Sequence, residues 1–186
     1  MRIGFAVCGS FCSFEKMFKE MINLSKKHEI VPIMSEIAYS TDTRFGKAED
    51  WRRKIEELCG RKIIHTVVEA EPLGPKRMVD ILLIEPCTGN TVAKLSSGIT
   101  DTAVTMAVKS VLRVGTPVVL TVATNDGLGA AAENIGRLMN RKNYFFTPLS
   151  QDAPKEKPTS LVADFTLTQE TLLLAAEKKQ IQPIYR

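Results

Sequence analysis

VDILLIEPCTGNTVAKLSSGITD, residues 79–101, is the stretch that decides the fold class of this chain. Residues 79–84 are apolar at almost every position, which is typical of a parallel strand covered on both faces. Pro86 is expected to end this strand. Small polar residues then lead into a helical pattern over 91–113, which is interrupted near Ser97 and Gly98. A buried strand that is followed directly by a helix predicts a β–α unit.

The same alternation of strand and helix runs through the rest of the chain. The expected strands are 2–8, 29–34, 62–68, 116–123 and 143–149, the expected helices are 14–27, 48–59, 130–142 and about 167–180, and the expected loops are 35–47, 71–77 and 151–159. Right-handed crossovers leave few topologies for such an order. We therefore expect an α/β fold, a three-layer, doubly wound parallel sheet of flavodoxin-like or Rossmann-like type, in a single domain over residues 1–186.

Composition narrows the class of protein further. No apolar run approaches the roughly 20 residues of a membrane span, and the N-terminus lacks the features of a signal peptide, so we expect a cytoplasmic protein that does not bind membranes. The net charge of +4 is spread along helical faces, as at Lys16 and Lys19, which indicates solvated surfaces rather than a nucleic-acid footprint. The four cysteines show no metal-ligand spacing, so no metal site is expected.

Four polar segments, 8–13, 35–46, 85–91 and 122–129, directly follow predicted strands. Ligands of doubly wound sheets bind beyond the carboxyl ends of the strands, so these segments should meet at one edge. Taken alone, each is equally well explained as a turn, a helix cap or a solvated loop, and the first is not a GxGxxG motif. Together they predict a pocket for a phosphorylated or carboxylated ligand.

Particular side chains in these segments suit such a ligand. Gly9 and Ser10 precede a helix N-terminus, where an anion is favoured, and Ser35 can add a hydrogen bond to a phosphate. Arg44 lies in a loop rich in hydroxyl groups and can pair with an anion. Asn90 offers both a donor and an acceptor to a planar heterocycle or a carboxylate.

The run Pro86–Thr91 resembles the PASANT motif of the flavin-containing cysteine decarboxylase family, and the likeness covers about residues 2–150. The resemblance implies bound FMN and a cofactor site made of seven residues: Gly9, Ser10, Phe11, Ser35, Cys87, Thr88 and Asn90. Residues 122–125 stand where that family has a PxMN motif and keep its Asn. The stretch that carries the family's catalytic His, shortly before the fourth strand, reads EPLGPKRMVD here and contains no His. A decarboxylase without it would lack an expected proton handler.

A further resemblance covers nearly the whole chain. The runs TRFG (43–46), AEPLGPK (70–76), TNDGLG (124–129), LMNRKNYFF (138–146) and QDAPKEKP (151–158) are similar to the B subunits of dipicolinate synthase. This resemblance implies a partner, the A subunit, which carries the nicotinamide cofactor NADP. The pair oxidises dihydrodipicolinate to dipicolinate in the mother cell of spore-forming bacteria. It also implies a homo-oligomer, built from trimers by analogy with related flavoproteins.

The product of that reaction is a planar dicarboxylate, so a site for it needs cations and paired donors around a flat slot. Arg44, Asn90 and Asn125 are the expected substrate-binding residues, with Lys76 or Lys94 as a further candidate. The sequence leaves open whether the pocket holds FMN or the substrate itself. It also leaves two other functions open, an FMN-dependent decarboxylase and a non-catalytic subunit that only stabilises its partner. No catalytic residue is predicted.

Overall fold

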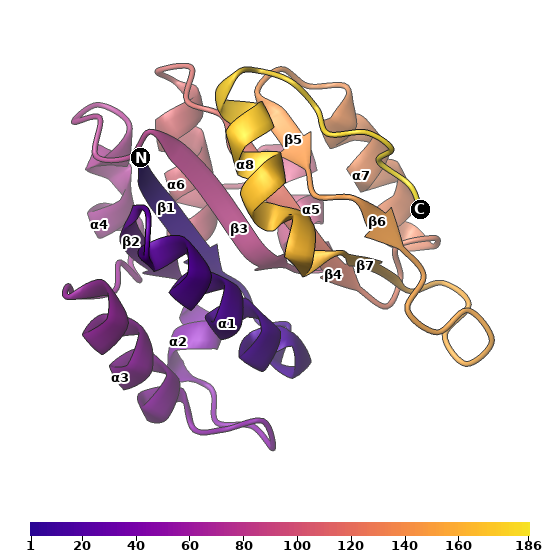
Figure 1. Ribbon diagram of the computed structural model, residues 1–186, viewed down its shortest axis with the longest axis horizontal. Coiled ribbons are helices and arrows are strands. Elements are labelled where there is room, and N and C mark those ends of the chain that lie inside the picture. Colours follow the sequence, from indigo (N-terminus) through magenta and orange to yellow (C-terminus); the bar gives the residue numbers. More distant parts are fainter.

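One mixed sheet organises the chain, and a computed structural model describes all of residues 1–186 (Figure 1). Its strands are β1 (Arg2–Val7), β2 (Glu29–Met34), β3 (Ile81–Cys87), β4 (Val118–Thr124), β5 (Tyr144–Phe146), β6 (Leu149–Ser150) and β7 (Leu161–Ala163). The first five are parallel in the order β2-β1-β3-β4-β5. This is the flavodoxin-like order, whose direction reverses between β1 and β3. The expected three-layer α/β fold is confirmed.

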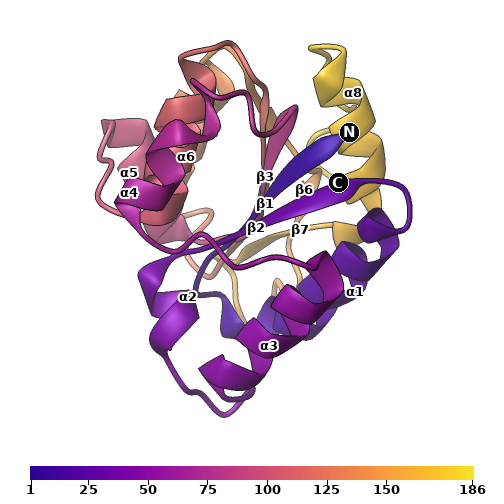
Figure 2. The same cartoon turned by 90° about the vertical axis from the view of Figure 1, so that its left-hand side faces the viewer.

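Two layers of helices cover the sheet. On one face lie α1 (Phe14–Ser25), α3 (Ala48–Cys59) and α8 (Thr168–Ala176), and on the other lie α4 (Val67–Ala70), α5 (Gly89–Ser97), α6 (Ala103–Leu112) and α7 (Ala130–Met139) (Figure 2). The short α2 (Glu36–Ser40) follows β2, and single 3-10 turns occur at η1 (Phe11–Ser13), η2 (Glu71–Leu73) and η3 (Phe165–Leu167). None of the helices has the length and apolar character that crossing a bilayer requires.

Strand β3 shows why the sheet needs both layers. Successive side chains of a strand point to opposite faces. Leu82 and Ile84 therefore join the core under α5 and α6, while Ile81 and Leu83 join the core under α1 and α8, and all four are fully buried. The unbroken apolar run in the sequence reflects burial on both sides.

Three predicted elements need correction. The expected strand 62–68 forms only one bridge, Ile33 to Ile64, because Thr66 and Glu69 form a capping box that starts α4 instead. The expected loop after β2 contains α2, which Ser35 caps. Pro86 does not end β3 but lies within it. The register there shifts between Ile84 and Cys87, and the Pro86 carbonyl accepts a hydrogen bond from the Cys8 amide at 3.2 Å.

The end of the chain departs from a purely parallel sheet. The expected strand 143–149 divides into β5 and β6, and β7 was not predicted at all. Strand β7 runs antiparallel to the end of β4, where Leu161 pairs with Thr124, and antiparallel to β6. The predicted final helix ends earlier than expected, at Ala176.

Candidate functional site

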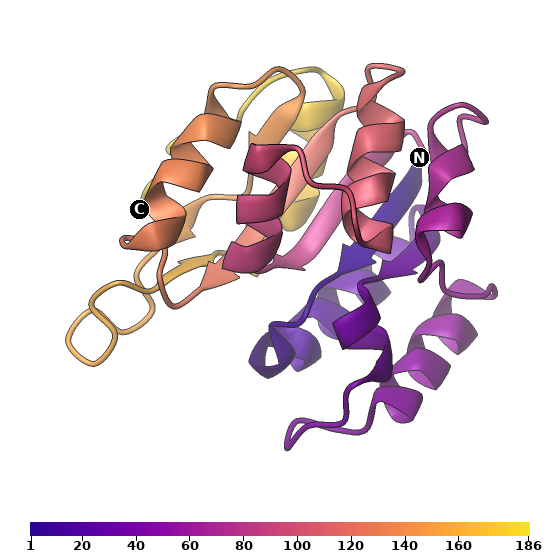
Figure 3. The same ribbon diagram turned by 180° about the vertical axis from the view of Figure 1, so that it is seen from behind.

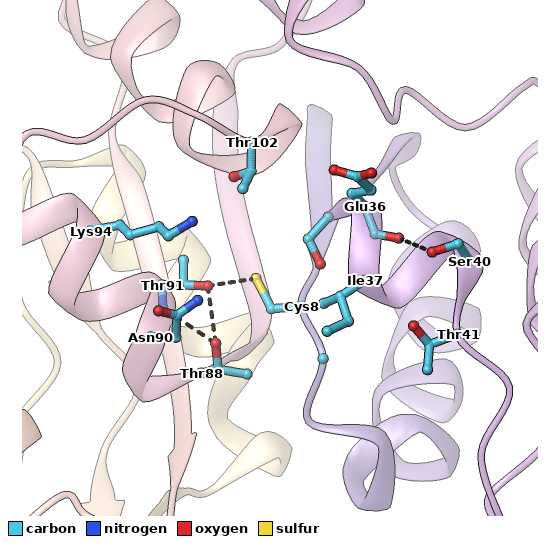
Figure 4. Close-up of a pocket in the computed structure, with 12 residues that line it drawn as sticks. Cys8, Glu36, Ile37, Ser40, Thr41, Thr88, Asn90, Thr91, Lys94 and Thr102 are labelled. Carbon is cyan, nitrogen blue, oxygen red and sulfur yellow. Dashed lines mark hydrogen bonds between the residues drawn. The ribbon is translucent and has the colours of Figure 1, made fainter.

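A cleft of about 470 Å³ opens at the carboxyl ends of β1 and β3, where the chain continues from β1 to α1 on one face of the sheet and from β3 to α5 on the other (Figure 4). This is the switch in strand order, at which doubly wound sheets bind ligands. The cleft has one wall from α5, one from α2, and a floor at the end of β1. Its lining consists of Cys8, Gly9, Ser35, Glu36, Ile37, Ser40, Thr41, Thr88, Asn90, Thr91, Lys94 and Thr102. We call this space the switch-point cleft.

The α5 wall is built around Thr88, the N-cap of that helix. Its hydroxyl accepts a hydrogen bond from the Thr91 amide at 3.3 Å and lies 3.0 Å from the Thr91 hydroxyl. The Thr91 hydroxyl in turn donates to the Cys8 sulfur at 3.2 Å, which ties α5 to the end of β1. Burial raises the pKa of the Cys8 thiol to about 11, so the thiol stays protonated at neutral pH.

Gly89 and Asn90 form the first turn of α5, next to the cap. A Cβ at Gly89 would lie 2.6 Å from the Thr124 hydroxyl and 2.9 Å from an Asp126 carboxylate oxygen, so any larger residue would force these two side chains to shift. The Asn90 side chain is exposed, lines the cleft and makes no hydrogen bond within the chain. Its amide therefore has both a donor and an acceptor free for a ligand.

The α2 wall faces α5 across the cleft. Ser35 caps α2 by accepting a hydrogen bond from the Ala38 amide at 3.4 Å. Ile37 stays 58% exposed although it is a large apolar residue, and it is one of two hydrophobic residues in the lining. A Cβ at Gly9 would come within 3.1 Å of the Ile37 side chain, so glycine keeps the floor open beside this wall.

The N-termini of two helices, α5 and α6, lie at the cleft. Thr88 begins α5, and Thr102 begins α6 with a capping box that includes Thr105. The first N–H groups of a helix lack intrahelical partners, and the helix dipole favours negative charge there. The cleft is therefore suited to an anionic group such as a phosphate or a carboxylate.

Side-chain charges in the cleft are few and opposed. The Lys94 ammonium reaches into it but pairs with the exposed Asp101 at 2.8 Å, and its hydrogen bond lowers the pKa of the Asp101 carboxyl. Glu36 projects from the opposite wall (Figure 4). An anion would thus be held mainly by backbone N–H groups and hydroxyls, not by a cluster of cations.

Four of the predicted site residues, Gly9, Ser35, Thr88 and Asn90, meet in the cleft. Ser10 and Phe11 lie next to it at the start of η1 but not in its lining. Cys87 is fully buried in the core under α5, where burial raises the pKa of its thiol well above the ordinary value.

Arg44 and Asn125 also fall outside the lining. The Arg44 guanidinium lies 4.8 Å from the centre of the Phe45 ring. Asn125 is exposed beside β7, and its carbonyl accepts a hydrogen bond from Thr159 at 2.7 Å. The roles expected for the residues outside the cleft stay predictions.

Several lining residues were not among the predicted site residues. These are Cys8, Glu36, Ile37, Thr91 and Thr102. Three other lining residues were expected near a ligand: Ser40 and Thr41 in the hydroxyl-rich loop that also holds Arg44, and Lys94 as a further candidate for a carboxylate. A Thr-x-x-Thr spacing occurs at the start of both α5 and α6, at Thr88–Thr91 and Thr102–Thr105. This spacing is a helix-capping signal, and it could have identified Thr102 from the sequence. Neither histidine lines the cleft. His65 instead stacks on Tyr39 with ring centroids 3.9 Å apart. The His28 ring lies against the N-terminal amino group of Met1, at 3.5 Å.

The fold and the cleft at its switch point define a flavodoxin-like protein, and the sequence assigns a family. The model of the flavoprotein family matches residues 1–167, and the chain belongs to this family. It is also 44% identical over 184 residues to the B subunit of dipicolinate synthase from Bacillus subtilis (strain 168), a match that covers 98% of this chain and 92% of that protein. The resemblance to the B subunits is thereby confirmed.

Solved structures agree with this assignment. The crystal structure of the dipicolinate synthase B subunit from Bacillus halodurans superposes with a TM-score of 0.91 at 38% identity, covering 100% of this chain and 95% of that one. The FMN-dependent cysteine decarboxylase SpaF superposes with a TM-score of 0.69 at 24% identity, covering 95% of this chain and 97% of that one. At that identity the likeness to SpaF shows the fold alone.

Proposed function

We propose that this chain is the B subunit of a dipicolinate synthase. It binds FMN in the switch-point cleft and acts with an A subunit that carries NADP. Together the two proteins oxidise dihydrodipicolinate to dipicolinate in the mother cell of a spore-forming bacterium. The similarity to two B subunits along nearly the whole chain supports the assignment.

One observation carries the flavin part of the proposal, the free Asn90 amide beside the N-terminus of α5 in a polar cleft. A phosphate suits the unpaired N–H groups of the helix starts, and a planar heterocycle with alternating donors and acceptors suits the Asn90 side chain. The cleft volume of about 470 Å³ falls within the range that binds cofactor-sized ligands. The residues present therefore fit the group.

Within this proposal each part of the cleft has a task. Thr88 and Thr102 hold the two helix starts in place, and Gly9 lets a ligand approach the end of β1. Ser35 lies on the opposite wall, where its hydroxyl can donate to a phosphate oxygen while it caps α2. Bound flavin supplies two-electron redox chemistry. The chain itself binds, orients and shields the reacting ring.

Arg44 and Asn125 have a different place in the proposal. Both lie outside the lining, so they contact substrate only if the substrate extends beyond the cleft or a neighbouring protomer completes it. We propose a homo-oligomer built from trimers and a single domain over residues 1–186. Light scattering on the purified protein measures its oligomeric state. A single unfolding transition that two probes report alike would support the single domain.

A decarboxylase is the second candidate, since the fold is shared with SpaF. The lining argues against it, because it contains no histidine and its one carboxylate, Glu36, is exposed to solvent. Decarboxylation of a peptide with a C-terminal cysteine, measured with this chain alone, would decide in favour of that reading. A subunit with a purely stabilising role is the third candidate.

The decisive test reconstitutes the chain with its A subunit and follows dipicolinate formation with and without added FMN. A visible flavin spectrum on the isolated chain is expected after reconstitution. Asn90→Ala should weaken FMN binding about fivefold to tenfold, the size expected for one or two lost hydrogen bonds. The matched control is Asn23→Ala, on the surface of α1, which should bind FMN like the unaltered protein.

The outcomes separate the candidates. Loss of both FMN affinity and dipicolinate formation in Asn90→Ala supports the proposal. Unchanged oxidation by the reconstituted pair would favour the purely stabilising role. A protein that takes up no flavin but still supports oxidation would assign the cleft to the substrate instead.

A further inference from the structure

A second cavity lies on the far side of the α5–α6 connection from the switch-point cleft. It has a volume of about 390 Å³, is open to solvent, and is bordered by the end of α5, by α6, and by residues from the end of α7 to β5. Figure 3 shows this face, with α5 in rose between α7 in orange and α6 in salmon. The two cavities share no lining residue. We call it the helix-face cavity.

The body of the helix-face cavity is apolar. Leu95 and Val108 form buried parts of its wall, at 4% and 1% exposure, and Leu112 is partly buried beside them. Gly98 ends α5 in the left-handed conformation, with φ of 73°, and the Ile99 amide then bonds back to the Lys94 carbonyl at 2.9 Å. This turn leaves Ile99 in the lining although its side chain is 46% exposed.

One polar group in this wall has no partner. Tyr144, at the start of β5, is only 9% exposed and lines the cavity, yet its hydroxyl makes no hydrogen bond within the chain. The hydroxyl oxygen itself is not fully buried, so it can donate to a ligand in the cavity. Burial raises the pKa of the Tyr144 phenol to about 12, so the group is a neutral donor at physiological pH.

Positive charge surrounds the apolar body. Lys109, Arg113 and Arg141 line the cavity, no carboxylate does, and none of the three forms an ion pair. Arg141 is held in place by hydrogen bonds to the Leu95 carbonyl at 3.1 Å and the Ser96 carbonyl at 2.7 Å. Glu71 borders a smaller neighbouring cavity with Lys109 and Arg113 but does not pair with either of them.

We propose that the helix-face cavity binds a small carboxylate with an apolar body, such as an aromatic acid. The apolar wall takes the body, the Tyr144 hydroxyl donates to a carboxylate oxygen, and Lys109, Arg113 and Arg141 compensate its charge. This site is separate from the switch-point cleft and independent of the function proposed for it.

The test measures binding to the full-length chain by ligand-observed NMR and by calorimetry, with no flavin, no partner and no assay of activity. Benzoate is the probe. Two controls accompany it. Benzamide keeps the ring but loses the charge, and acetate keeps the charge but loses the ring. Benzoate should bind at millimolar concentration or below, and both controls should bind at least tenfold more weakly.

Two variants locate the site. Tyr144→Phe keeps the ring in the core and should weaken benzoate about fivefold through loss of one hydrogen bond. Arg113→Gln should weaken it about threefold and reduce its sensitivity to salt, because an exposed cation contributes a modest, screened attraction. Lys16→Gln, an exposed lysine on α1, is the charge-matched control and should leave the affinity unchanged.

Equal binding of benzoate and benzamide, or an affinity unaltered in both variants, would overturn the proposal. So would the absence of any benzoate binding at high millimolar concentration. Circular dichroism on each variant confirms that the fold is intact. Failure here leaves the function proposed for the switch-point cleft untouched, because Tyr144 and Arg113 do not line that cleft.

Discussion

Replacing Glu85 by glutamine should change how the stability of the fold depends on pH. Glu85 lies in β3, is fully buried, and points to the same face as Ile81 and Leu83. One carboxylate oxygen accepts a hydrogen bond from the Thr168 hydroxyl at 2.6 Å, and the other has no partner. Burial raises the pKa of this carboxyl from 4.5 to about 8, and hydrogen bonds offset only part of that effect.

The sign of the effect follows from proton linkage. Below pH 4.5 the carboxyl is protonated in both the folded and the unfolded chain, so it has no effect on the pH dependence. Between pH 4.5 and about 8 the folded chain holds the proton more tightly, and the free energy of unfolding therefore falls as pH rises. At about 1.4 kcal/mol per pKa unit, the shift from 4.5 to about 8 corresponds to a loss of about 5 kcal/mol across this window.

Glu85→Gln keeps the shape of the side chain and cannot ionise. Its oxygen can still accept from Thr168, while its NH₂ group takes the position that has no partner, at a cost of about 1–3 kcal/mol. The variant should therefore be less stable than the unaltered protein at pH 5 and more stable at pH 9. The difference between the two free energies of unfolding should change by about 4 kcal/mol over that range, because part of the loss has already occurred at pH 5.

Urea denaturation at a series of pH values measures this directly. The chain has one tryptophan, Trp51, which is buried against Phe14 and Phe18 and so reports unfolding by its fluorescence. Glu170→Gln, an exposed acid on α8, is the control and should follow the pH profile of the unaltered protein. Parallel profiles for Glu85→Gln and the unaltered protein would show that Glu85 is not neutral in the fold, and the reasoning would be refuted.

Three further predictions concern the cleft and the cysteines. Gly89→Ala should lower the free energy of unfolding by about 1–3 kcal/mol in urea denaturation, because its Cβ would overlap Thr124 and Asp126. The control is Gly136→Ala on α7, which has open space around it and should raise the free energy of unfolding by about 0.5–1 kcal/mol. Thr88→Ala should lower the free energy of unfolding by about 1 kcal/mol through loss of the α5 cap, and Thr88→Ser should restore it. Iodoacetamide at pH 8 should alkylate the exposed Cys12 first, because burial raises the pKa of the thiols of Cys8 and Cys59 to about 11. Mass spectrometry measures the alkylation rate of each cysteine, and equal rates for Cys8 and Cys12 would contradict this prediction.

The central part of the fold could be predicted from the sequence because its signals are local. Strands β1 to β4 are short apolar runs, and the helices between them show regular apolar spacing, so the β–α alternation is readable without knowledge of distant contacts. The site residues that follow these strands directly could be predicted for the same reason. Gly9, Ser35, Thr88 and Asn90 meet because parallel strands bring their carboxyl ends to one edge.

The positions of Arg44 and Asn125 could not be predicted because individual loop contacts, not a periodic pattern of residues, set them. The loop that carries Arg44 is tied to α3, where Asp42 accepts from the Ala48 amide at 2.8 Å and the Trp51 indole donates to the Phe45 carbonyl at 3.3 Å. Asn125 is held beside a segment more than 30 residues later in the chain, through a hydrogen bond with Thr159. No local pattern in the sequence marks either contact.

The cleft also shows why side-chain motifs point only indirectly at its binding groups. Thr88 accepts from the Thr91 amide, and the first intrahelical bond of α5 runs from the Val92 amide to the Thr88 carbonyl at 3.0 Å. The N–H groups of Gly89 and Asn90, which come between, lie in the first turn and have no intrahelical partner, so they are free for an anion. In the proposed site the threonine thus sets the geometry, while the backbone of its neighbours would hold the anion. A change at Thr88 should therefore act first on the start of the helix and only through it on the ligand, whereas a change at Asn90 should act on the ligand alone.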